Sequence, residues 1–283
     1  MPAPLKRGTT SPNHMKSSFF FFSVLAFTLL SSFTFAQGQK AKILGLTKTP
    51  DPDSEPGSLI QLPLRVHLVT NVELQQKGTT MDMWIKPQDF QKKILPEINR
   101  IWKPANIQWV LESLVIQPAP DLPNKKELTT FIQNSKRLPS GKSDPKRSLA
   151  VLQLCNRARS HPAIHNLYFF PYLGKTYQGF AGLKGNYAVV TTWTDKPFRA
   201  RKPPIKFPFT EELPFKIGSI ARTCSHELGH NLALQHPDKT TQTRFNRLMG
   251  GKKHGYTLVP EEIELARKTA LERAKLIRKW AEQ

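Results

Sequence analysis

The chain has 283 residues, with 42 Lys and Arg against 21 Asp and Glu, so its formal net charge is +21. Hydrophobic residues make up 39% and charged residues 22%, which is typical of a folded globular protein and excludes a wholly disordered chain. The two cysteines exclude a disulfide-built scaffold and a zinc site made of four thiolates.

The N-terminal residues 1–36 have the pattern of a secretory signal peptide. Three basic residues and no acidic residue accompany an apolar run, Phe19 to Phe35, which ends in small residues at Thr34 and Ala36. The alternative is an uncleaved anchor, since about 17 apolar residues is the short limit for a spanning helix. We expect cleavage after Ala36, no stable membrane span afterwards, and a secreted or periplasmic (cell envelope) location.

The remaining chain is expected to form one large domain. Residues 37–61 are rich in Lys, Pro, Asp, Ser and Gly, which indicates a linker or a short pro-segment, and residues 62–283 form the domain. This mature chain keeps a net charge of +18, because the first 36 residues carry three basic residues and no acidic one. The charge favours non-specific binding to anionic surfaces, or simply a solvated basic surface, and no specific nucleic-acid module is recognised.

The periodicity of apolar residues predicts an α+β fold. An amphipathic helix is expected over 87–102, with a kink at Pro96, and further helices over 215–232 and 260–280, while a short polar helix is possible over 125–136. Strands are expected at 64–69, 107–116, 149–154, 166–170 and 187–193, where β-formers concentrate.

The helix predicted over 215–232 carries the pattern most informative about chemistry. His226 and His230 are four residues apart, so both project from one helix face and can share a metal ion. Glu227 is turned about 100° away and can lie beside a metal-bound water. If the helix then ends, His236 can return as a third ligand, and three imidazoles with an open fourth position are typical of catalytic zinc.

These eleven residues, 226–236, resemble the long zinc motif of the metzincin metallopeptidases, H-E-x-x-H-x-x-G-x-x-H. The segment 247–251 resembles the methionine turn of that family, which would place Met249 beneath the zinc; the alternative is an ordinary core methionine. The resemblance implies a zincin-like fold over residues 62–283: a twisted, mostly parallel sheet with an antiparallel edge strand, an active-site helix and a C-terminal helix. It also implies one Zn²⁺ per chain.

One position departs from the family pattern, because Ala233 stands where the motif has Gly. A left-handed conformation costs a non-Gly residue about 1 kcal/mol. Either Ala233 is strained, or Asn231 adopts that conformation and the helix break shifts. We expect either outcome to displace His236.

The chemistry of such a site is peptide hydrolysis by a zinc-activated water, with Glu227 as general base. The expected substrate is a protein or peptide that lies extended along an edge strand near 178–184 and adds to it as a further strand. The residues assigned to substrate binding are Gln178, Gly179, Phe180, Ala181, Gly182 and Leu183. The alternative for this segment is a glycine-rich loop without substrate contact.

Two further alternatives remain open at the level of sequence. Cys155 and Cys224 either pair in a disulfide or stay as free buried thiols. The chain as a whole is interpreted as a secreted zinc metalloendopeptidase. The rival is a non-catalytic, zinc-stabilised module that binds an anionic envelope or extracellular polymer, and a module of that kind has no need for Glu227.

Overall fold

The computed structural model describes residues 58–135, 144–175, 177–195, 202–210, 218–238, 246–250 and 255–282. The chain divides into two compact units, residues 1–41 and 42–283, and every described residue belongs to the second. The predicted signal peptide and residues 37–57 lie outside the described residues. No helix within the described ranges is both long and apolar enough to cross a membrane.

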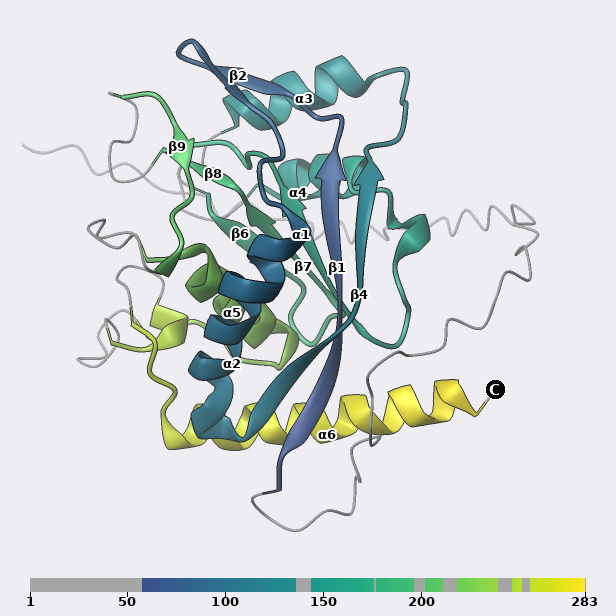
Figure 1. The fold of residues 1–283 in the computed structure, drawn as a ribbon, viewed down its shortest axis with the longest axis vertical. Coiled ribbons are helices and arrows are strands. Elements are labelled where there is room, and N and C mark those ends of the chain that lie inside the picture. Colours follow the sequence, from purple (N-terminus) through teal and green to yellow (C-terminus); the bar gives the residue numbers. More distant parts are fainter. Residues whose placement is uncertain are drawn as a thin grey trace, which may run out of the picture. The chain divides into compact units, whose positions relative to one another are not determined.

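A five-stranded, mostly parallel sheet forms the centre of the fold (Figure 1). Its strand order is β4-β1-β5-β7-β6, and only β6 at one end runs antiparallel to its neighbour. The strands are β1 (Ile60–Thr70), β4 (Ile107–Pro118), β5 (His165–Phe170), β6 (Gly179–Ala181) and β7 (Tyr187–Thr191). Two small antiparallel pairs accompany the sheet: β2 (Leu74–Gln76) with β3 (Thr79–Met81), and β8 (Trp193–Thr194) with β9 (Ile205–Lys206).

Helices cover both faces of the sheet, because successive strand residues are buried on opposite sides. In β5, Leu167 and Phe169 pack into one apolar cluster, whereas Tyr168 and Phe170 pack into another. The first cluster includes side chains of the helical run α1 (Pro87–Asp89), a π-helical turn (Phe90–Ile94) and α2 (Leu95–Trp102), and of α5 (Ile220–Asn231) and α6 (Pro260–Ala281). The second includes α3 (Lys125–Asn134) and α4 (Pro145–Leu154).

The kink expected at Pro96 takes the form of the π-helical turn directly before α2. Pro96 has no backbone N–H and its ring conflicts with the carbonyl four residues earlier, so the regular α-helical ladder cannot continue through it. Widening the preceding turn accommodates the ring while Phe90 and Ile94 stay fully buried.

The strand predicted at 149–154 is wrong, since these residues belong to helix α4. The side chains buried along it are Arg147, Ala150, Val151 and Leu154, which is helical spacing. Asp144 begins the helix by accepting a hydrogen bond from the backbone N–H of Lys146. A short apolar run by itself fits either a strand or a helix. The Asp-Pro pair before this run indicates a helix, because Asp is favoured at the N-cap and Pro at the first helical position.

Several predicted boundaries also shift. Strand β1 begins at Ile60, inside the segment expected to be linker, and Pro63 is tolerated there because pairing with β5 begins only at Leu64. Helix α5 begins at Ile220 rather than at 215: residues 218 and 219 are not helical, and 215–217 lie outside the described residues. Strand β7 ends at Thr191.

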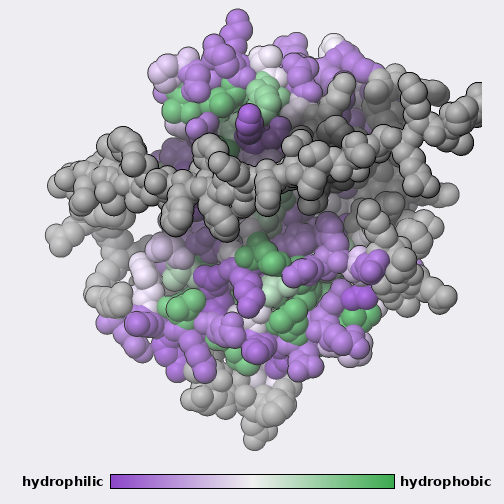
Figure 2. Space-filling model, turned by 180° about the vertical axis from the view of Figure 1, so that it is seen from behind, coloured by the Kyte–Doolittle hydropathy of each residue, from purple (hydrophilic) through white to green (hydrophobic). Residues whose placement is uncertain are grey.

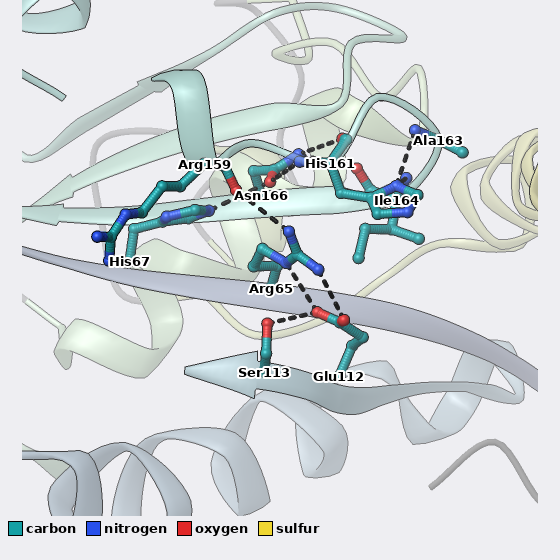
Figure 3. A network of polar contacts seen from close by, with 9 residues as sticks. All are labelled: Arg65, His67, Glu112, Ser113, Arg159, His161, Ala163, Ile164 and Asn166. Carbon is teal, nitrogen blue, oxygen red and sulfur yellow. Dashed lines mark hydrogen bonds and ion pairs between the residues drawn. The ribbon is translucent and has the colours of Figure 1, made fainter. Parts of the chain in front are cut away.

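A partly buried polar network joins β1, β4 and β5 near the face that carries α4 (Figure 3). A register shift in β4 turns Glu112 toward Arg65, and the two form a bidentate ion pair at 2.7 and 2.8 Å. The amide of Asn166 donates to the carbonyls of His161 and Ile164. Asn166 also donates to Asn186 O, so the network fixes the start of β7.

The surface is largely hydrophilic on the face shown in Figure 2, where hydrophobic residues form separate small groups among polar ones. Among the described residues, ion pairs join Arg65 to Glu112, Arg100 to Glu97 and Arg247 to Glu262.

His165 gives a testable pH dependence of stability. Burial lowers its pKa to about 3, whereas an unfolded histidine titrates near 6.5. As pH falls below about 6.5 the unfolded state alone takes up this proton, so the free energy of unfolding falls until about pH 3. Between pH 7 and 5, a His165→Leu variant should lose about 2 kcal/mol less than wild type. Urea unfolding of both proteins in chelator measures this, and parallel pH curves would contradict it.

Candidate metal centre and active site

Helix α5 begins at a strong capping signal and runs through the core. Gly218 has a φ of +76°, and the Ser219 side chain accepts a hydrogen bond at 3.0 Å from the backbone N–H of Arg222. Eleven of the twelve helix residues are buried, and His230 alone is half-buried. The helix therefore presents His226, Glu227 and His230 from a rigid, solvent-excluded element.

The helix ends in a Schellman turn with Ala233 in the left-handed position. Ala233 has a φ of +70°, the Leu234 N–H donates to Gly229 O at 2.9 Å, and the Ala233 N–H donates to His230 O at 3.0 Å. Of the two alternatives for this departure, the strained Ala233 is the one observed, because Asn231 remains helical. The expected displacement of His236 is wrong: the turn closes with alanine and returns His236 to the helix.

The three histidines form one cluster. One ring nitrogen from each of His226, His230 and His236 lies within 4.8 Å of the others, and the Nε2 atoms of His226 and His236 are 3.1 Å apart. Two nitrogens bound to one tetrahedral zinc at about 2.05 Å lie about 3.3 Å apart, so this separation fits a shared ion.

Backbone carbonyls fix which nitrogen of each helix histidine faces the cluster. His226 Nδ1 lies 2.8 Å from Leu248 O, and His230 Nδ1 lies 2.8 Å from Leu234 O. A carbonyl only accepts, so Nδ1 carries the proton and Nε2 presents a lone pair. Burial lowers the pKa of His226 far below its usual value and also lowers that of His230, which keeps both rings neutral, as metal ligands must be.

The Glu227 carboxyl is buried between α5 and strand β6. Burial raises its pKa to about 8, while the guanidinium groups of Arg222 and Arg147 act in the opposite direction. A Cβ atom added to Gly179 would lie 2.6 Å from Glu227 Oε1, closer than real side chains approach. Gly179 is therefore required where β6 passes the carboxylate.

The segment assigned to substrate binding lies beside this carboxylate as the last strand of the sheet. Residues 179–181 form β6 and pair antiparallel with β7, and the carbonyl of Gln178 accepts from Thr191 N at 2.9 Å. Gly182 and Leu183 follow the strand, and Leu183 is exposed. The structure thus contains an edge strand here rather than a loop, and its contact with substrate stays a prediction.

Met249 is fully buried and packs against helix α5 at Gly229. A Cβ atom on Gly229 would lie 2.8 Å from the Met249 sulfur, so this glycine lets the methionine approach α5 closely. Arg222 holds the same segment by donating to Leu248 O at 2.7 Å and Gly255 O at 3.2 Å. Leu248 O thus accepts from both Arg222 and His226.

The two cysteines are free thiols, which decides between the two alternatives left open by the sequence. Cys224 packs in the cluster on the α5 face of the sheet, whereas Cys155 packs in the cluster on the α4 face, so the sheet separates them. Burial raises the pKa of both thiols above the usual value. Neither is a metal ligand in the histidine cluster.

Other functional neighbours were not anticipated. Arg222 lies one turn before His226, and its role was not visible because it donates to carbonyls 26 and 33 residues further along the chain. The close approach at Gly179 had a weak signal, a glycine inside a predicted strand.

Comparisons with known proteins add little to this geometry. No family model matches the chain, and no curated protein matches it. Among solved structures, archaemetzincin from Methanopyrus kandleri aligns with 76% of this chain and 97% of its own, at 14% identity and a TM-score of 0.36. A chaperone–substrate complex aligns with 77% of this chain and 35% of its own, at 12% identity and a TM-score of 0.40. Similarity at this level carries no argument about the reaction.

Ala233→Gly tests the strain at the end of α5. Glycine adopts the observed φ without steric cost but is more flexible in the unfolded chain, so we expect a net gain of up to about 1 kcal/mol in the free energy of unfolding. Denaturant unfolding of the metal-free protein measures it. A loss of stability would show that Ala233 is not strained.

Gly179→Ala tests the contact between β6 and Glu227, because the added methyl group conflicts with Oε1. We expect the free energy of unfolding to fall by about 1 to 3 kcal/mol, because the methyl group forces the strand and the carboxyl apart. Denaturant unfolding of the metal-free protein measures it. Gly182→Ala is the matched control, since its Cβ atom would meet the Tyr187 ring at 3.4 Å, an ordinary contact. Equal stability of the two variants would contradict the assigned contact.

Proposed function

We propose that the chain is an exported zinc-dependent endopeptidase. The observation that carries this proposal is the convergence of three imidazoles within 4.8 Å of one another, with the buried carboxyl of Glu227 next to the first ligand in sequence. Three nitrogen ligands with a carboxylate outside the ligand set are typical of catalytic zinc sites rather than structural ones.

In this proposal each residue has one role. His226, His230 and His236 hold the metal through ring nitrogens, and the carbonyls of Leu248 and Leu234 keep the first two rings in the required tautomer. When bound, zinc supplies Lewis acidity that polarises the scissile carbonyl. Met249 supplies an apolar surface below the helix.

Glu227 moves the proton. Its carboxylate takes a proton from the attacking water as the C–O bond forms, and delivers it to the leaving nitrogen as the C–N bond breaks. Burial favours the protonated acid and thereby strengthens the carboxylate as a base. The nearby Arg222 keeps the ionised form accessible.

The substrate is proposed to be an extended peptide that adds to β6. This strand is the last in the sheet order and passes directly beside Glu227. A peptide paired with β6 would carry its backbone across the front of the carboxylate without requiring a particular side chain. Export rests on the signal-peptide pattern of residues 1–36, and the basic surface is proposed to concentrate the enzyme near anionic material.

Glu227→Gln separates catalysis from metal binding. The variant keeps all three histidines and should bind one zinc per chain, but it lacks the base and should lose at least about a thousandfold in kcat. Metal analysis of residues 37–283, with hydrolysis of a mixed peptide library before and after chelation, measures both. Wild-type cleavage should stop with chelator and return with zinc.

The alternative outcomes are distinct. Unchanged hydrolysis in Glu227→Gln would exclude the proposed base. One zinc per chain without any hydrolysis by wild type would favour the zinc-stabilised module that binds anionic polymer. Absence of zinc would exclude a metal site at the three histidines.

A further inference from the structure

The turn that joins β6 to β7, residues 182–186, is held by donors from two helices. The Lys184 N–H donates to His230 O at 3.0 Å. The Asn231 amide, at the end of α5, donates to Gly182 O at 3.0 Å and to Tyr187 O at 2.9 Å. This turn is therefore bonded to the carbonyl of a proposed metal ligand and to the residue that follows it.

Helix α6 supplies the second anchor. Arg273 Nη2 lies 3.1 Å from Lys184 O and 3.1 Å from Gly185 O, and the side chain is half-buried. Lys184 has a φ of +54°, and a Cβ atom on Gly185 would lie 2.9 Å from Gly182 O, so the turn is tight and conformationally restricted. A guanidinium group with two carbonyl acceptors suits such a turn because its donors are fixed in one plane.

The geometry points to Arg273 as a positioning residue for the peptide-binding edge of the sheet. It holds the turn at one end of β6, and the turn keeps that strand in the position in which a peptide can pair with it. This inference rests on the proposed peptidase function and extends it to a helix remote in sequence from the zinc motif. Arg273 touches no reacting atom.

Helix α6 also offers a matched control. Arg267 uses the same chemistry: it donates to Ala105 O at 2.8 Å and to Ser58 O at 2.9 Å. Those carbonyls lie beside the first residues of β4 and β1, away from the turn. Arg267 also donates to Asn106 O at 3.5 Å. Arg273→Ala and Arg267→Ala therefore each remove a guanidinium group that caps backbone carbonyls, but only the first affects the β6–β7 turn.

The experiment compares wild type, Arg273→Ala, Arg273→Lys and Arg267→Ala, each loaded with zinc. The kcat and KM values are measured on a peptide long enough to pair along β6. For Arg273→Ala we expect KM to rise about tenfold, with kcat and zinc content nearly unchanged, because binding alone is disturbed. Arg273→Lys should recover part of the loss, and Arg267→Ala should keep the wild-type KM.

Hydrogen exchange gives a readout that does not depend on activity. The Lys184 amide should exchange faster in Arg273→Ala than in Arg267→Ala. If wild type hydrolyses peptides and the two alanine variants share one KM, the positioning role is wrong while the peptidase stands. Loss of zinc from Arg273→Ala would likewise overturn it. A wild type that hydrolyses nothing removes the proposed function itself.

Discussion

The orientation of two imidazoles depends on carbonyl groups that the chain supplies only after helix α5 has ended. His230 bonds to Leu234 O, just beyond the Schellman turn, and His226 bonds to Leu248 O, next to Met249. Both carbonyls are placed by backbone geometry, so the histidine cluster is complete only when the helix has ended at the right residue and the later segment has packed against it. These contacts depend on Ala233, whose left-handed conformation ends the helix.

The sheet also contacts this site, through strand β6. Strand β6 passes Glu227 at a distance that only glycine permits, and the turn behind it bonds to His230 O. The carboxylate is thus enclosed by a helix and a strand that belong to different parts of the chain. This burial raises the pKa of Glu227. The strand that covers the carboxylate is also the edge along which a peptide is proposed to lie.

The sequence could predict what depends on local pattern. The histidine spacing located the histidine cluster, and helical periodicity located α2 and α6, because spacing and helical faces are properties of short segments. The sequence could not distinguish strand from helix at 149–154, because Leu149, which is exposed in the structure, makes the apolar run continuous. It could not foresee Arg222 or Arg273, whose acceptors lie 26 to 89 residues away. It overestimated the effect of Ala233 because surrounding contacts absorb the strain of one residue.

Several arginines of this basic chain act as internal donors to the backbone. Arg222 and Arg273 each donate to two carbonyl groups, and Arg267 donates to three. A lysine cannot reproduce the planar geometry of these bonds. Part of the arginine content of this basic chain therefore joins backbone segments that are far apart in the sequence, in addition to the charge that it contributes.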